Sequence, residues 1–237
     1  MANPTPLNNP EDHAPAGHEH YTPGFLKIYD LLVLGFYGNV VWRCPTRRLV
    51  EHYDRHVRRR HLDVGPGTGY FLERARLPAD ARIALLDPNP DVLAHASRRL
   101  ARLAPSVIEA DVCTPITRPL MGPLTDERRF DSAALNYVLH CLPGPMARKA
   151  AAVRNVAAVL MPDGVLFGAT VLGTPPLHTW LSRAVLGYVN RKGIFDNLSD
   201  TEAGLRDILS DAFEVVDLQV VGSVAVFSAA TPRHLPS

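Results

Sequence analysis

Short apolar runs alternate with longer amphipathic segments from residue 61 onward. The runs predict strands at 61–64, 83–86, 107–110, 131–136 and 165–171, and apolar residues at helical spacing predict helices at 69–77, at 90–103 and from residue 146 onward. Short apolar strands separated by amphipathic helices are typical of a parallel sheet that is covered on both faces. Two more extended runs, 213–220 and 223–229, are joined at Gly222 and can only be antiparallel neighbours. The pattern therefore predicts an α/β fold.

The N-terminal part of the chain lies outside this alternation. Residues 1–20 carry almost nothing apolar and predict a disordered tail. Residues 21–59 predict two helices, the first beginning at Thr22-Pro23 and the second after Pro45-Thr46. Because the first helix carries many large apolar residues, we expect this part of the chain to fold as a lid over a ligand site.

A second departure follows the strand at 165–171. Residues 173–199 form an insertion with a helix from Pro175-Pro176 to Gly193, and Ser199 to Glu202 reads as a capping box for a helix that ends near Ala212. A length of 237 residues suits one α/β domain with additions better than two full domains. We therefore expect a single domain over residues 21–237, with the insertion as a cap.

Three glycines at alternate positions, Gly65, Gly67 and Gly69, follow the first predicted strand and precede a helical pattern. Glycines without Cβ let the backbone turn sharply and approach a ligand closely, and the first N–H groups of the following helix point out of the turn. Such a loop by itself is equally consistent with a simple turn between a strand and a helix.

Acidic residues at strand ends add to this signal. Asp63, Asp87 and Asp111 end the first three predicted strands, and ligands of open α/β sheets bind at that carboxyl edge. Asp87 follows Gly65 by 22 residues (87 − 65), which suits a carboxylate that accepts both hydroxyls of a ribose. Asp111 could accept the exocyclic amine of a purine. One extended nucleoside ligand could therefore touch all three acids.

The spacing of the glycines distinguishes two nucleoside cofactors. Dinucleotides call for G-x-G-x-x-G with a helix N-terminus facing a pyrophosphate, whereas this chain has G-x-G-x-G with Asp63 two positions before the first glycine. A carboxylate there would repel pyrophosphate but attract an ammonium group, which S-adenosylmethionine carries.

The chain resembles the class I S-adenosylmethionine-dependent methyltransferases from about Tyr21 to Ala229. The first motif of that family resembles Asp63 to Gly69, the second Leu86-Asp87, and the third Ala110-Asp111-Val112. The fourth motif resembles Phe130-Asp131 to Leu142. Met161 to Val165 resembles the turn before the fifth strand, although Asp163 departs from the usual residue there. The resemblance implies a Rossmann-like, doubly wound sheet of seven strands, mostly parallel with an antiparallel last strand. It also implies S-adenosylmethionine as the cofactor and S-adenosylhomocysteine as its product.

The same resemblance implies roles for individual residues. The cofactor would be held by Asp63, Gly65, Pro66, Gly67 and Gly69 at its methionine portion, by Asp87 and Pro88 at the ribose, by Asp111 and Val112 at the adenine, and by Asn136 and Tyr137 near the sulfonium and the acceptor. Tyr21 and Tyr29 are candidates for the lid over the cofactor.

Methyl transfer requires that a nucleophile be held in line with the sulfonium methyl while water is excluded, so a general base is optional. His140 is the first candidate for a base, followed by His178 and Tyr188. The insertion supplies His178, Trp180, Tyr188 and Phe195 as candidate lining of a pocket for a small, largely apolar or aromatic acceptor. The methylated atom (O, N, C or S) stays open, as do two alternatives: a protein that binds the cofactor without transferring its methyl, and an NAD-dependent oxidoreductase.

Composition and charge restrict the kinds of molecule that this protein is expected to bind. A formal net charge of +1 gives no field that would attract a polyanion, and Asn136-Tyr137-Val138-Leu139 is unlike the Asn-Pro-Pro-Tyr sequence of methyltransferases that act on nucleic-acid bases. The spacing of Cys44, Cys113 and Cys141 fits neither a disulfide framework nor a zinc site, and we expect no metal. Without a signal peptide or a membrane-spanning run, the expected location is the cytoplasm. The oligomeric state stays open, a homodimer included.

Overall fold

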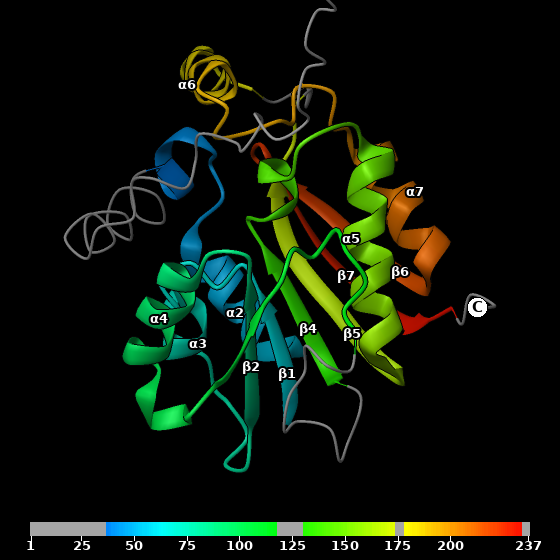
Figure 1. Cartoon of the computed structure of the whole chain (residues 1–237). Helices are drawn as coiled ribbons and strands as arrows, with labels where there is room; N and C mark the ends of the chain where they lie inside the picture. The colour runs from blue at the N-terminus through cyan, green and yellow to red at the C-terminus, as the bar shows by residue number, and fades with distance from the viewer. Residues whose placement is uncertain (1–36, 118–129, 174–177, 234–237) are drawn as a thin grey trace, which may run out of the picture.

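The computed structural model describes residues 37–117, 130–173 and 178–233. A seven-stranded sheet with the strand order β3-β2-β1-β4-β5-β7-β6 forms its centre (Figure 1). The strands are β1 (Arg60–Val64), β2 (Arg82–Asp87), β3 (Ser106–Glu109), β4 (Phe130–Asn136), β5 (Leu160–Val171), β6 (Phe213–Val221) and β7 (Val224–Pro232). β7 is antiparallel to both β5 and β6, and all other neighbouring strands are parallel. The predicted Rossmann-like α/β fold is confirmed.

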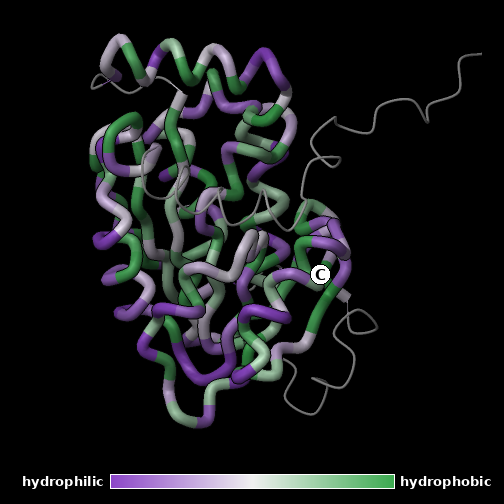
Figure 2. The backbone as a smooth tube through the Cα atoms, turned by 90° about the vertical axis from the view of Figure 1, so that its left-hand side faces the viewer, coloured by the Kyte–Doolittle hydropathy of each residue, from purple (hydrophilic) through white to green (hydrophobic). Residues whose placement is uncertain are grey.

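Helices cover both faces of the sheet. α2 (Thr46–His56), α3 (Tyr70–Arg74) and α4 (Pro90–Arg99) lie on one side, and α5 (Met146–Val159) and α7 (Glu202–Ala212) lie on the other (Figure 1). α6 (Trp180–Arg191) lies beyond the ends of the strands, apart from both layers. Figure 2 shows hydrophobic and hydrophilic residues alternating along this helix at the top of the molecule, as expected for a helix with one buried face.

β1 shows how strand alternation divides the core. Leu62 and Val64 join the apolar cluster on the α5 side, whereas His61 and Asp63 point to the opposite face, where Tyr53 of α2 packs. His61 is 0% exposed and Asp63 is 5% exposed. β1 therefore buries two titratable groups under α2, at the strand that leads into the glycine turn.

The residues just before α2 belong to the core as well. Val41 and Trp42 are buried in one cluster with Val171 of β5 and Leu186 of α6. The carbonyl of Trp42 accepts a hydrogen bond from the Ser223 N–H at 2.8 Å. Ser223 Oγ also lies 3.0 Å from Nδ1 of His178, just before α6. The insertion that carries α6 therefore packs on residues 41–42 and on the turn between β6 and β7.

Two predicted helices are shorter than expected. α3 ends at Arg74 instead of residue 77, since Ala75 is extended and Leu77 precedes a proline, which disfavours helical backbone. The predicted helix 90–103 ends at Arg99 and continues as a single turn of 3-10 helix, Ala101–Leu103.

The predicted capping box of α7 is also wrong. Thr201, and not Ser199, is the N-cap, and its Oγ1 accepts a hydrogen bond from the Gly204 N–H at 3.0 Å. The intervening Asp200 is bound to Lys149 of α5, and this tertiary contact is consistent with a helix that starts two residues later than predicted. Residues 1–20, Tyr21, Tyr29, Pro175 and Pro176 lie outside the described residues. The insertion helix begins later than predicted, because Thr179 is extended and caps α6, whose first residue is Trp180.

Candidate active site

The turn after β1 depends on glycine at three positions. Gly65, Gly67 and Gly69 have φ of 62°, 54° and 76°, in the left-handed region that favours glycine. The Gly65 N–H donates to the Leu86 carbonyl at 2.8 Å, which ties the turn to β2. A Cβ on Gly65 would lie 2.6 Å from Cγ2 of Val138. The turn is therefore packed directly against the segment that follows β4.

Asp63 lies one residue before the end of β1, at the base of this turn. Burial raises the pKa of its carboxyl to about 7, and a hydrogen bond from Tyr53 partly opposes that rise. The carboxylate is thus held inside the α2 side of the sheet by a phenol hydroxyl from another element.

The other two strand-end acids shape the turns that follow their strands. Oδ1 of Asp87 accepts a hydrogen bond from the Asn89 N–H at 2.8 Å, and Oδ1 of Asp111 accepts one from the Cys113 N–H at 2.8 Å. Asp87 ends β2, and Asp111 follows β3 by two residues and is exposed. A carboxylate can accept several hydrogen bonds, so a turn contact is compatible with a ligand contact at the same group. Pro88 is exposed and Val112 is buried.

Asn136 and Tyr137 lie at the end of β4, beside the glycine turn. Asn136 is 9% exposed, and its buried Nδ2 has no hydrogen-bond partner among the described residues. Tyr137 has φ of 59°, and its N–H donates to the Ala169 carbonyl at 2.7 Å. A buried amide donor without a partner costs about 1–3 kcal/mol, so Asn136 fits a site whose acceptor comes from a ligand.

His140 is buried behind these residues. It is 2% exposed, and burial lowers the pKa of its imidazole to about 3. Nδ1 accepts a hydrogen bond from the Val171 N–H at 3.2 Å, so the proton of the neutral ring is on Nε2. The nitrogen with a lone pair is already occupied, which makes His140 a poor proton acceptor for a substrate.

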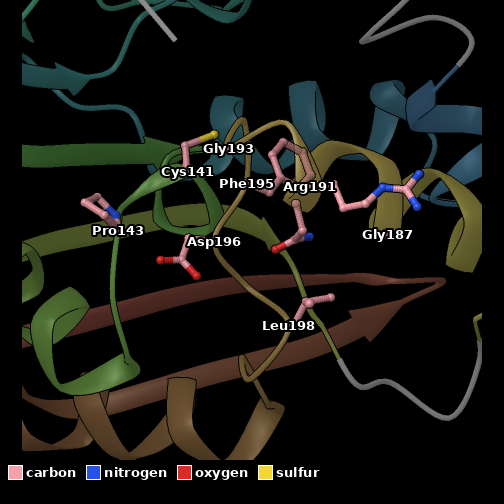
Figure 3. A pocket seen from close by; sticks show the side chains of 9 residues that line it. Cys141, Pro143, Gly187, Arg191, Gly193, Phe195, Asp196 and Leu198 are labelled. Atoms are coloured by element: carbon pink, nitrogen blue, oxygen red, sulfur yellow. The ribbon is translucent and has the colours of Figure 1, made fainter. Parts of the chain in front are cut away.

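A cavity of about 520 Å³ opens between α6 and the segment after β4 (Figure 3). Its lining residues are Cys141, Pro143, Gly187, Asn190, Arg191, Gly193, Phe195, Asp196 and Leu198. The Phe195 ring contacts the His140 ring, with centroids 4.2 Å apart, and the Tyr137 ring lies 5.7 Å from His140 on centroids. Phe195 therefore forms a wall that the cavity shares with the residues after β4.

The other predicted pocket residues do not line this cavity. Trp180 and Tyr188 are 76% and 52% exposed on α6. His178 anchors the start of α6, because Nε2 contacts the Leu172 carbonyl at 3.0 Å and Nδ1 contacts Ser182 Oγ at 3.1 Å. Their assignment to the acceptor stays a prediction.

Sequence reasoning missed the polar neighbours of Asp63. Tyr53 Oη lies 2.7 Å from His61 Nε2, and His61 Nδ1 lies 2.9 Å from Ser132 Oγ. A signal was present in the sequence, because His61 and Asp63 are two residues apart on the predicted strand 61–64, whose other residues are apolar, and this spacing places them on one face. In residues 37–117, 130–173 and 178–233, no helix is long and apolar enough to cross a membrane, and no group of three or more potential metal ligands is found.

The strand order, the left-handed glycine turn and the acids at the ends of neighbouring strands together define a class I S-adenosylmethionine-dependent methyltransferase. Comparison with known proteins agrees. The profile of the family described as Methyltransferase domain matches residues 62–166. Demethylluteothin O-methyltransferase of Streptomyces thioluteus is 38% identical over 216 residues, covering 91% of each chain. The physcion biosynthesis cluster O-methyltransferase of Aspergillus chevalieri is 35% identical over 214 residues, covering 90% of this chain and 94% of its own. The chain belongs to this methyltransferase family.

A solved structure shares the fold. The N-methyltransferase NodS of Bradyrhizobium japonicum, in complex with S-adenosylhomocysteine, aligns with a TM-score of 0.58 at 16% identity, covering 89% of this chain and 98% of its own. Membership of the family makes S-adenosylmethionine the cofactor. The unpartnered Asn136 Nδ2 and the open space beside Gly67, where a Cβ would meet nothing within 4 Å, fit a ligand of that kind.

Proposed function

We propose that this methyltransferase transfers a methyl group to a hydroxyl oxygen of a small, largely apolar, aromatic acceptor. The observation that carries the proposal is the cavity that shares Phe195 with the segment after β4. Pro143, Phe195 and Leu198 give it apolar walls, and Asn190, Arg191 and Asp196 give it polar groups. Pockets of this mixed composition suit ring systems that bear a few polar substituents.

The choice of oxygen is supported by the relatives. Both relatives described above are named O-methyltransferases, and they align over at least 90% of this chain. Near-neutral charge and the absence of the Asn-Pro-Pro-Tyr sequence support a small acceptor over nucleic acid.

Residues of the chain would act mainly by positioning. The bound cofactor supplies a methyl group on a sulfonium, which is already a strong electrophile. Asp63, Asp87 and Asp111 would bind it, Asn136 would donate a hydrogen bond to it or to the acceptor, and Phe195 would exclude water from the acceptor side. His140 would hold Val171 and support Phe195 without taking a proton.

The test is release of S-adenosylhomocysteine when the protein is offered aromatic and heterocyclic phenols, amines and acids, with bulk transfer RNA and DNA as comparison acceptors. We expect turnover on phenols. Turnover on amines alone would contradict the choice of oxygen, and turnover on nucleic acid alone would contradict a small acceptor. Tight cofactor binding without turnover on any acceptor would favour a protein that binds without transferring.

A pair of variants tests the cavity. Phe195→Ala should raise KM for a phenol by about tenfold, because truncating a large aromatic wall removes roughly 1.5 kcal/mol or more of apolar contact. Val215→Thr changes an exposed apolar residue on β6, 60% exposed, and should leave KM unchanged. Equal KM values in both variants would place the acceptor elsewhere.

A further inference from the structure

A chain of buried polar groups runs beneath the glycine turn and ends at Asp63. Ser132 Oγ accepts a hydrogen bond from the Arg58 N–H at 2.9 Å and lies 2.9 Å from His61 Nδ1. His61 Nε2 lies 2.7 Å from Tyr53 Oη, and Tyr53 in turn hydrogen-bonds the Asp63 carboxyl. This series of polar groups joins β4, β1 and α2.

One set of hydrogen-bond directions along this series of groups ends at an ionised Asp63. A carboxylate can only accept, so Tyr53 must donate its hydroxyl proton to Asp63. The Tyr53 oxygen then accepts from Nε2–H of His61, and the bare Nδ1 of His61 accepts from the Ser132 hydroxyl. Every donor in this series of hydrogen bonds points toward Asp63. Aligned hydrogen bonds in a low-dielectric interior strengthen one another.

Protonation of Asp63 would reverse these directions. With one proton taken up from solvent, Asp63 can donate to Tyr53, Tyr53 to Nε2 of His61, and Nδ1–H of His61 to Ser132 Oγ. The neutral tautomer of His61 therefore reports whether Asp63 is ionised. His61 itself stays uncharged, because burial lowers the pKa of its imidazole to about 3.

We propose that Tyr53, His61 and Ser132 are positioning residues that hold the Asp63 carboxylate ionised and oriented for the ammonium group of the cofactor. The proposal rests on the proposed cofactor role of Asp63. Tyr53 acts on the ligand only through Asp63, and its ring is fixed by stacking on Phe71 at 6.0 Å and by an edge contact with Phe167 at 5.0 Å.

Within residues 37–117, 130–173 and 178–233, burial and the Tyr53 hydrogen bond are the two influences on the pKa of Asp63. Burial is the largest cause of its raised pKa, which is about 7, and the Tyr53 hydrogen bond opposes that rise. Leu85 of β2 and Ala134 of β4 lie opposite it in the sheet. His52 and His56, elsewhere on α2, pack on Phe167. Cofactor binding should therefore strengthen as pH rises from about 6 to 8 and Asp63 ionises.

The first test is calorimetric titration of S-adenosylhomocysteine into the full chain between pH 5.5 and 8. Tyr53→Phe keeps the ring and removes the hydroxyl, so it should weaken binding at pH 7 by about tenfold or more and move the midpoint of the pH dependence upward. The control is His52→Leu, which removes a buried hydrogen bond from the same helix to the Phe227 carbonyl at 2.9 Å. His52→Leu should lower the melting temperature and leave the pH midpoint unchanged.

The second test needs no ligand. Nitrogen NMR of the wild-type protein should show His61 changing from the Nδ1–H to the Nε2–H tautomer as pH rises through about 7, with the signal assigned by its loss in His61→Gln. In Asp63→Asn the tautomer should no longer depend on pH. A His61 tautomer that ignores pH in the wild type, or a Tyr53→Phe midpoint equal to that of the wild type, would overturn the proposal. Failure of the wild type to bind S-adenosylhomocysteine while His61 still titrates would instead contradict the cofactor role of Asp63.

Discussion

Nζ of Lys149 in α5 lies 2.5 Å from Oδ2 of Asp200, the residue at which the insertion returns to the domain, and both side chains are at most 2% exposed. Nζ also donates to the Asp196 carbonyl at 2.7 Å. Oδ2 of Asp196 accepts a hydrogen bond from the Gly144 N–H at 2.7 Å. One buried ammonium thus fixes the wall of the cavity to the helix after β4.

Lys149→Met should destabilise the protein by about 3–5 kcal/mol, because it leaves Asp200 buried without its cation. Burial already raises the pKa of Asp200, and Lys149 lowers it. Without Lys149, the folded state would bind the Asp200 proton more tightly, so the deficit should be larger at pH 8 than at pH 5. Urea unfolding at both pH values measures this. Lys192→Met, at an exposed lysine after α6, should change stability by less than about 0.5 kcal/mol.

Asp87→Ala should weaken S-adenosylhomocysteine binding by about 1.5–3 kcal/mol, because charge-assisted hydrogen bonds to the ribose would be lost. Calorimetry provides the measurement. The matched control is Asp80→Ala, which removes an exposed carboxylate that pairs with Arg59 at 2.6 Å, at the opposite end of β2. Unchanged affinity in Asp87→Ala would show that the ribose assignment is wrong.

Gly65→Ala and Gly67→Ala should differ in stability although both positions have positive φ. A Cβ on Gly65 meets Val138 at 2.6 Å, whereas a Cβ on Gly67 meets nothing within 4 Å. Overpacking at the first position should cost roughly 1–3 kcal/mol beyond the shared backbone strain. Thermal unfolding of the ligand-free variants tests this, and Val138→Ala should restore part of the loss in Gly65→Ala but none in Gly67→Ala.

His140→Leu should weaken the pH dependence of stability below pH 6.5. The pKa of His140 is lowered to about 3 by burial, so between about pH 3 and 6.5 the unfolded chain binds a proton that the folded chain does not. Stability therefore falls as pH falls, by about 1.4 kcal/mol per pH unit for this one group. Denaturant unfolding from pH 4.5 to 7 should show a slope smaller by about one proton in the variant.

His140→Ala tests the histidine as a base in the methyl transfer itself. We expect the maximal rate to fall by much less than the 10²-fold typical of losing a general base, since Nδ1 is already engaged by Val171. A loss of 10²-fold or more in kcat, with an unchanged cofactor affinity, would restore His140 as the base.

Truncation separates the predicted lid from the core. A chain that begins at residue 21 should be active, and a chain that begins at residue 43 should be inactive, because it lacks Val41 and Trp42, which are 1% and 4% exposed. A chain that begins at residue 37 keeps both core residues and removes residues 21–36, which carry the first predicted helix of the lid with Tyr21 and Tyr29. It should fold, as judged by its melting temperature, and turn over poorly. Full activity of the 37–237 chain would exclude a lid formed by residues 21–36.

The local pattern of this sequence was enough to predict much of the fold. Strands such as 83–86 are short, apolar and bounded by turn residues, so their type follows from nearest neighbours along the chain. The left-handed turn at Gly65 and the acids Asp87 and Asp111 could be predicted for the same reason. The conformation of the turn depends on glycine, and the ability of the two acids to accept hydrogen bonds at the sheet edge depends on residue type and on position near a strand end.

Contacts between distant elements required the tertiary structure. Tyr53 and Ser132 lie on α2 and β4, and only the packing of those elements against β1 brings them to His61 and Asp63. The N-cap of α7 is Thr201 instead of the predicted Ser199. Asp200, which lies between them, contacts Lys149, which is 51 residues away in the sequence.

The sequence by itself determined the class of protein, because spacing along a strand, turn and helix is a local property that specifies which ligand the turn can hold. The tertiary structure decided how each titratable group behaves. His140 is a plausible base in the sequence, but burial and the Val171 N–H make it a neutral hydrogen-bonded support. Protonation depends on desolvation and on partners in three dimensions, and neither is encoded by distance along the chain.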